Sequence, residues 1–135
     1  MPLLLDTGFI YALAERDDAW HERAREYFVR VREVCVVPAP VVPEVAYLLR
    51  QRLGADQERE FVASLAHGEL EVEDIEPEDY RRCVALMKQY RDIGFVDAAV
   101  VSVAERLRLR VIATTDRRHF GRIKPVHVAA FELVP

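Results

Sequence analysis

The segment Leu3–Leu13, with the sequence LLLDTGFIYAL, carries the clearest signal for the fold. Its three leading leucines form a short apolar run that ends at Asp6. After Thr7 and Gly8, apolar residues return at the three- and four-residue spacing of one helix face. The segment therefore predicts a strand, a tight turn and a helix, with an acidic side chain where the strand ends.

Similar units follow along the chain. Val34–Val37 and Val111–Ala113 are apolar at every position, which is typical of strands covered on both faces. We expect helices at about 17–31, 43–53, 56–67, 77–91 and 95–107, and weaker strands at 70–75 and 126–131. This alternation predicts an α/β fold, a three-layer α/β/α sandwich whose central, mostly parallel sheet has four to five strands.

Length and charge limit the possibilities further. The chain has 135 residues, 51% of them apolar, which suits a single domain over residues 1–135. The net charge of −4 favours no nucleic-acid partner by itself. Apolar stretches are far shorter than the roughly 18 to 20 residues of a membrane span, and the first six residues lack the basic region of a signal peptide. We therefore expect no membrane partner.

The two cysteines indicate the compartment. Cys35 and Cys83 show no CxxC spacing. Cys35 falls in a predicted strand, and Cys83 shares one face of a predicted helix with Tyr80, Val84 and Met87. Buried, unpaired cysteines are typical of a reducing environment, so we expect a cytoplasmic protein.

Four acidic residues follow or open the predicted elements at places where ligands bind. Asp6 and Asp116 follow two predicted strands, at the edge of a parallel sheet where connections emerge. Glu44 and Asp97 lie near the starts of two predicted helices. All four are too far apart in the chain for local pairing, so only the fold can assemble them.

Each acid has a simpler explanation when it is taken alone. Glu44 and Asp97 can stabilise a helix N-terminus through the helix dipole, and Asp6 can form an Asx turn. Together, however, like charges raise one another's pKa and oppose folding unless a cation neutralises them. Oxygen ligands without paired cysteine or histidine favour Mg²⁺, with Mn²⁺ as a substitute.

Four stretches of the chain resemble the PIN domain and, within it, the VapC-type toxins of prokaryotic toxin–antitoxin pairs. They read LLLDTGFIYAL, VVPEVAYLL, GFVDAAVVSVAERL and VIATTDRRHF. The resemblance covers nearly the whole chain in the family's order. It implies that Asp6, Glu44, Asp97 and Asp116 are the catalytic, metal-binding acids.

The same resemblance implies a function and partners. It predicts a magnesium- or manganese-dependent endoribonuclease that hydrolyses RNA phosphodiester bonds and is the toxin of a toxin–antitoxin pair. Such proteins are commonly homodimeric and are inhibited by a cognate antitoxin protein. We expect an apolar helix of that partner to bind a surface formed by Val45, Leu49, Phe61 and Leu65, while a cationic side chain contacts the acids.

Three hydroxyls and two guanidiniums near the acids are candidates for positioning water or binding substrate. They belong to Thr7, Thr114, Thr115, Arg117 and Arg118. Turn and strand-end preferences explain the threonines equally well, and a solvated surface explains the arginines, which lie in the basic segment 103–124.

Other polar and aromatic residues have plainer expectations. We expect His119 to pack beside Phe120, with substrate binding as the alternative. We expect Trp20 to lie in the core or an interface and not to be a surface on which bases stack. The acid-rich segment 56–79 is expected to face solvent.

Two other functions fit parts of the sequence. A phosphate-accepting receiver domain also alternates strands and helices, but it needs adjacent acids near the first strand and a lysine late in the chain, where this sequence offers mainly arginines. A catalytically silent PIN-fold module that binds RNA or a partner protein keeps the fold without the chemistry. The complete set of four acids argues against this second alternative.

Overall fold

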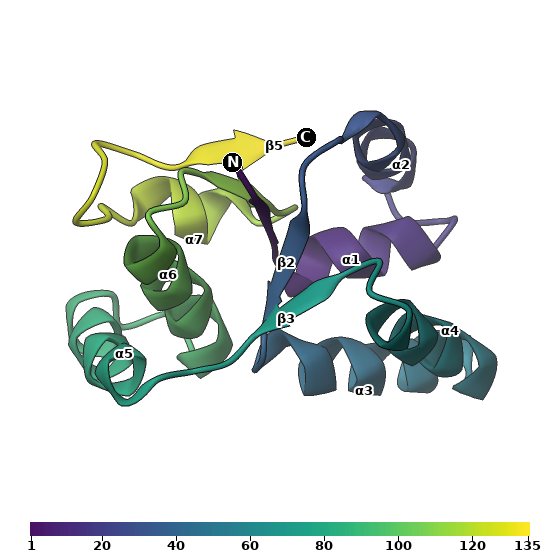
Figure 1. The fold of residues 1–135 in the computed structure, drawn as a ribbon, viewed down its shortest axis with the longest axis horizontal. Helices are drawn as coiled ribbons and strands as arrows, with labels where there is room; N and C mark the ends of the chain where they lie inside the picture. The colour runs from purple at the N-terminus through teal and green to yellow at the C-terminus, as the bar shows by residue number, and fades with distance from the viewer.

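A five-stranded parallel sheet forms the centre of the computed structural model, which describes residues Met1–Pro135 (Figure 1). The strand order is β3-β2-β1-β4-β5, and all four neighbouring pairs are parallel. The strands are β1 (Leu3–Leu5), β2 (Cys35–Pro38), β3 (Glu71–Glu73), β4 (Val111–Ala113) and β5 (Glu132–Val134). The prediction of a mostly parallel sheet of four to five strands is confirmed.

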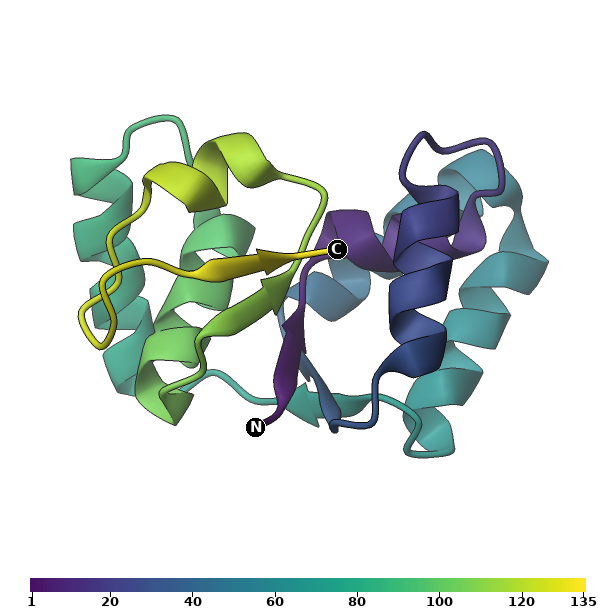
Figure 2. The same ribbon diagram turned by 90° about the horizontal axis from the view of Figure 1, so that it is seen from above.

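Seven helices cover the two faces of the sheet. In Figure 2 the helices that precede β3 lie on one side of the sheet and those that follow it lie on the other, which confirms the predicted three-layer sandwich. The first group is α1 (Thr7–Ala14), α2 (His21–Arg30), α3 (Val41–Leu53) and α4 (Ala55–Ala66). The second group is α5 (Pro77–Gln89), α6 (Phe95–Leu107) and α7 (Arg117–Arg122).

The strand order reverses next to β1, because β2 and β3 extend the sheet on one side of it and β4 and β5 on the other. Such a reversal opens a crevice at the carboxyl ends of the strands. Backbone hydrogen bonds continue the ladder up to that edge: Asp6 N–H donates to Ala113 O at 3.0 Å, and Thr114 N–H donates to Val134 O at 2.9 Å. The residues that follow β1 and β4 are therefore held by the sheet itself.

The core surrounds the short central strands. All three leucines of β1 are buried, as are Val37 of β2 and Ile112 of β4. On one face of the sheet α6 is buried along most of its length, since α5 packs over it. The two free cysteines, Cys35 and Cys83, are buried as expected.

Helix α5 turns a different face to the core from the one that its apolar spacing indicates. Cys83 and Leu86 are buried together with Asp79, whereas Tyr80, Val84 and Met87 are exposed. The predicted grouping of Cys83 with these three residues is therefore wrong. Asp79 accepts hydrogen bonds from Arg106 and from the Glu76 backbone, and these contacts hold the helix in this rotation.

Ionic contacts tie α5 and α6 to the loop after β3. Arg106 Nε lies 3.0 Å from Asp79 Oδ2, and Arg106 Nη1 lies 3.2 Å from Glu73 Oε2 and 3.5 Å from Glu76 Oε1. Asp79 also accepts the backbone N–H of Glu76 at 3.0 Å in a capping box. The side chain of Asp79 is only 2% exposed, so the expectation that the acid-rich segment 56–79 faces solvent is wrong at this residue.

The last strand begins later than the pattern at 126–131 predicts. Val126 N–H donates to Glu105 Oε2 at 2.9 Å, and His127 Nε2 lies 2.6 Å from Leu109 O. These contacts hold the segment against the end of α6, and the chain joins the sheet only at Glu132. No helix in the structure has the length and apolar character needed to cross a membrane.

Candidate active site

Four helix N-termini bring the predicted acids to the carboxyl edge of the sheet. Asp6 follows β1 and is the N-cap of α1, and Asp116 follows β4 and is the N-cap of α7. Glu44 lies in the first turn of α3, and Asp97 lies in the first turn of α6. We call these four residues the acid cluster. The positive ends of the four helix dipoles partly offset its negative charge.

Thr114 joins two members of the acid cluster. Its Oγ1 donates to Asp6 Oδ2 at 2.8 Å and accepts the backbone N–H of Asp116 at 2.9 Å. The side chain is fully buried, so this hydroxyl has no contact with solvent. Thr114 therefore sets the relative position of the two acids that end β1 and β4.

The electrostatics of the acid cluster are unfavourable without a cation. Burial raises the pKa of Asp6 to about 7, although the Thr114 hydrogen bond lowers it, and the charges of Asp97 and Glu44 raise it further. Burial also raises the pKa of Asp97, and the charge of Asp116 adds to this effect. Neither Asp6 nor Asp97 forms an ion pair with a lysine or arginine.

The donor set fits a divalent metal ion. Carboxylate oxygens are the ligands that Mg²⁺ and Mn²⁺ prefer, and a bound cation would remove the charge repulsion that raises the pKa of Asp6 and Asp97. Ligand atoms of Asp97, Asp116 and His119 lie within 4.8 Å of one another. Thr7 Oγ1 is buried without a hydrogen-bond partner, which leaves it available to a water or ligand beside Asp6.

His119 contacts the acid cluster directly, contrary to the expectation that it only packs beside Phe120. Its Nδ1 lies 2.7 Å from Asp116 Oδ2, and its backbone N–H donates to Asp116 Oδ1 at 3.0 Å. Its Nε2 lies 3.4 Å from Asp92 Oδ2. The hydrogen bond to Asp116 is the main reason that the pKa of His119 is raised. The spacing of three residues between an N-cap aspartate and a histidine is the signal that could have revealed this contact.

Gly8 allows α1 to approach the loop after β4. A Cβ atom at this position would lie 2.4 Å from Thr115 Oγ1. Thr115, which precedes Asp116 in the chain, is thus packed against the start of α1, the helix that Asp6 caps. A side chain at position 8 would therefore force the Thr115 hydroxyl to move.

The basic segment 103–124 separates into paired and unpaired arginines. Arg106 contacts the acids around α5, and Arg122 pairs with Asp92 at 2.5 Å. Arg117 and Arg118 are exposed and pair with no acidic side chain. Only part of the predicted basic surface therefore remains available to a phosphate.

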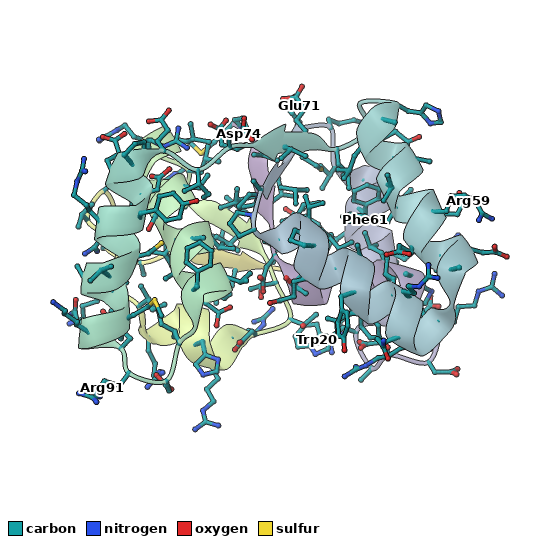
Figure 3. The ribbon with its side chains drawn as sticks, turned by 90° about the horizontal axis from the view of Figure 1, so that it is seen from below. Trp20, Arg59, Phe61, Glu71, Asp74 and Arg91 are labelled. Atoms are coloured by element: carbon teal, nitrogen blue, oxygen red, sulfur yellow. The ribbon has the colours of Figure 1, made fainter.

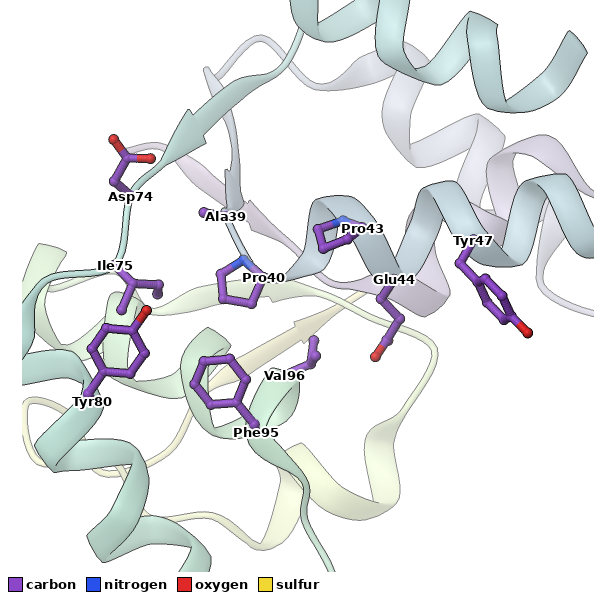
Figure 4. A pocket seen from close by; sticks show the side chains of 10 residues that line it. All are labelled: Ala39, Pro40, Pro43, Glu44, Tyr47, Asp74, Ile75, Tyr80, Phe95 and Val96. Atoms are coloured by element: carbon purple, nitrogen blue, oxygen red, sulfur yellow. The ribbon is translucent and has the colours of Figure 1, made fainter. Parts of the chain in front are cut away.

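A hollow of about 930 Å³ opens beside Glu44 (Figure 4). In this view Glu44 and Tyr47 extend from α3, while Tyr80 and Phe95 line the opposite side. The rings of Tyr80 and Phe95 are stacked, with centroids 5.9 Å apart and an interplanar angle of 4°. An aromatic surface thus borders the acid cluster.

A smaller hollow of about 210 Å³ lies between α1, α2 and α4. Apolar side chains from these helices and their neighbours line it, among them Ile10, Leu13, Phe28, Leu49 and Phe61. The four residues of the predicted partner surface do not all lie at this hollow. Leu49 and Phe61 line this hollow, but Val45 is fully buried in the core and Leu65 does not line it.

Comparisons with known proteins agree on one family. The family model described as "PIN domain" matches residues 3–124. The chain is similar to a protein of Mycobacterium tuberculosis named Ribonuclease VapC26, with 31% identity over 98% of this chain and all of that one.

Solved structures share the fold. One is the M. tuberculosis protein VapC20, described as a sarcin–ricin loop cleaving toxin, with a TM-score of 0.84 and 22% identity over 94% of this chain and 98% of that one. Another is a toxin–antitoxin complex from Klebsiella pneumoniae, with a TM-score of 0.71 and 20% identity over 90% and 92% of the two chains. A DNA-bound VapBC structure from Salmonella typhimurium matches with a TM-score of 0.70 and 17% identity over 98% of each chain.

Proposed function

Because this chain belongs to the PIN domain family, we propose that it is a metal-dependent endoribonuclease and the toxin of a toxin–antitoxin pair. The observation that carries this proposal is the acid cluster, in which Asp6 and Asp97 have raised pKa values and form no ion pair with a lysine or arginine. The name of the M. tuberculosis relative, Ribonuclease VapC26, supports the same activity. We place the activity in the cytoplasm, where both free thiols stay reduced.

Each acid has a distinct setting for metal binding. Asp6 is oriented by Thr114, whose hydroxyl donates to Oδ2. Asp116 is held at both oxygens by His119, and Asp97 lies close to both groups. Glu44 is exposed beside the hollow and can complete the set from the opposite side. A bound Mg²⁺ or Mn²⁺ would activate a water and stabilise the leaving oxygen of the phosphodiester.

The first experiment follows RNA cleavage by the purified protein with Mg²⁺, with Mn²⁺ and with excess chelator. We expect cleavage with either metal and none with chelator. Asp97→Asn and Asp116→Asn should lower the rate at least a hundredfold, whereas Glu71→Gln, an exposed acid on β3, should leave it unchanged. Undiminished cleavage in chelator would contradict the proposal.

The RNA substrates for this assay are chosen by comparison. The similar VapC20 structure is described as that of a sarcin–ricin loop cleaving toxin, so a hairpin with this loop is the first RNA to test. An unrelated hairpin and an unstructured RNA of equal length are the comparison substrates. Faster cleavage of the first hairpin would extend the proposal to that loop, and equal rates would limit it to general endoribonuclease activity.

We propose that the antitoxin places an apolar helix on the hollow between α1, α2 and α4. Its lining of Leu13, Phe28 and Phe61 offers apolar contact at the surface, in the manner of helix-in-groove recognition. One similar structure is described as a toxin–antitoxin complex, and another as a DNA-bound VapBC. Coexpression with the neighbouring reading frame, followed by size analysis, should show a complex that does not cleave RNA. Leu13→Glu should weaken this complex.

We also propose that the protein is a homodimer. Tyr47, Tyr80, Val84, Met87 and Phe95 are all exposed, and we call this surface the aromatic face. Three of them, Tyr47, Tyr80 and Phe95, line the same hollow, and exposed aromatic and apolar side chains are typical of protein interfaces. Because the aromatic face borders Glu44, two copies joined there would bring their acid clusters toward each other across the large hollow.

A further inference from the structure

Two guanidiniums, from residues far apart in the chain, lie close to the ring of Trp20. The Arg23 guanidinium carbon lies 3.9 Å from the ring centroid, and that of Arg117 lies 5.4 Å from it. Cation–π contacts at these distances orient a guanidinium without neutralising its charge. We call Trp20, Arg23 and Arg117 the Trp20 platform.

The two arginines of the Trp20 platform keep their charge available. Neither forms an ion pair with an aspartate or glutamate. Arg117 additionally donates to the carbonyl oxygen of Pro135, which limits its movement. Other arginines, such as Arg82 and Arg106, are instead engaged by acidic side chains.

The Trp20 platform lies next to the acid cluster. Arg117 directly follows Asp116 in the chain. The loop that carries Trp20 is ordered, because Asp18 Oδ1 accepts the Trp20 N–H at 2.8 Å and His21 Nδ1 lies 2.7 Å from Ala12 O. In Figure 3 Trp20 is seen between the ribbons of α3 and α7. Helix α3 carries Glu44, and α7 follows Asp116.

An RNA strand that reaches the acid cluster needs cations nearby, since the phosphate backbone and the carboxylates repel each other. Arginine suits this role because it binds phosphate with two N–H groups and stacks on unpaired bases. Trp20 holds two such groups in place, so little side-chain freedom is lost on binding.

On the basis of the function proposed above, we infer that the Trp20 platform binds the RNA strand beside the cleaved bond. Arg23 and Arg117 contact phosphates, and an unpaired base stacks on the guanidinium or indole surface. This contact increases RNA affinity and leaves the chemistry at the acid cluster unchanged.

The test compares Arg23→Ala with Arg25→Ala, an exposed and unpaired arginine on the same helix. Binding of a fluorescently labelled single-stranded RNA of about 12 nucleotides is measured by anisotropy in chelator at low salt. We expect Arg23→Ala to raise Kd about five- to tenfold and Arg25→Ala to raise it less than twofold. In Arg23→Ala, the slope of log affinity against log salt concentration should also become smaller, by about the amount that one phosphate contact contributes.

Substitutions of Trp20 test whether its aromatic ring is needed for RNA binding. Trp20→Leu should weaken binding as Arg23→Ala does, and Trp20→Phe should restore most of it, because phenylalanine keeps an aromatic surface. Thermal unfolding of each variant confirms that the fold is kept.

Kinetics separate this inference from the proposed function. In metal-dependent cleavage, Arg23→Ala should raise KM and leave kcat within twofold. Equal RNA affinity of Arg23→Ala and Arg25→Ala would overturn the inference even if the wild-type protein cleaves RNA. Selective loss of affinity in Arg23→Ala would support it even if no cleavage occurs, and only the proposed function would then fail.

Discussion

Asp6 is a buried carboxylate whose charge opposes folding until a metal binds. Its pKa is about 7 in the folded protein and near 3.8 when exposed, so the folded state keeps a proton that the unfolded chain releases. Stability is therefore lost as pH rises from about 4 to 7 and stays level above that. Asp6→Asn should remove this loss and raise the free energy of unfolding at pH 8 by about 2 to 4 kcal/mol.

Chemical denaturation in chelator at pH 5 and pH 8 measures this effect. The gain should be larger at pH 8, and Mg²⁺ should stabilise the wild-type protein more than the variant. Exposed Glu71→Gln is the matched control and should change stability by less than about 0.5 kcal/mol. A variant that is less stable than wild type at pH 8 would show that the Asp6 charge is already neutralised by other means.

The hydroxyl of Thr114 is the other decisive atom at this scale. Thr114→Val keeps the shape of the side chain but leaves Asp6 Oδ2 and the Asp116 N–H without their shared partner. We expect a loss of about 1 to 3 kcal/mol in stability and at least tenfold in RNA cleavage. Thr114→Ser retains the hydroxyl and should keep most of the activity, so similar rates for the two variants would contradict this role.

The sequence predicts the positions of the site's acidic residues better than the contacts of the residues around them. Asp6 and Asp116 follow apolar runs, and a strand end is visible in the residue pattern. The contacts of His119 and Trp20 depend on rotamers and on the packing of α7 against the loop before α2, which no spacing records. Thr114 likewise acquires its role only when β1 and β4 lie side by side.

At the scale of elements, the contact between α5 and α6 depends on a buried charge. Arg106→Ala would leave Asp79, which is 2% exposed, without its cation. Removing one partner of a buried ion pair is costly, so we expect a loss of about 2 to 4 kcal/mol in the free energy of unfolding. The exposed pair Arg59–Asp56 provides the control, and Arg59→Ala should cost less than about 0.5 kcal/mol.

These contacts also explain why the secondary structure was predicted better than the orientation of α5. Pro77 and the capping box fix where the helix begins, and both are local signals. Which face packs inward depends on Arg106, which is distant in sequence. The late start of β5 has a similar cause, because Glu105 and Leu109 hold the preceding segment away from the sheet.

At the scale of the whole molecule, the aromatic face should control self-association. Val84 is 54% exposed on α5, so Val84→Glu introduces a charge into the proposed dimer interface without disturbing the core. We expect wild-type protein to sediment at twice the 15.6 kDa chain mass and Val84→Glu to sediment as a monomer.

The control for this experiment is Val29→Glu on α2, where the valine is 68% exposed and lies outside the aromatic face. This variant should remain dimeric. If both variants stay dimeric, the second copy binds elsewhere, and if wild-type protein is monomeric at all concentrations, the homodimer proposal is wrong.

The position of β1 has a consequence for the newly made protein. Although β1 is synthesised well before β4, the two strands pair, with Leu4 opposite Ile112 and Leu5 opposite Ala113. Such long-range pairing folds late. Asp6 is therefore synthesised before Asp97 and Asp116. A half-translated chain cannot assemble the site that would attack the RNA around it. The order of translation itself delays assembly of the site until Asp116 has emerged.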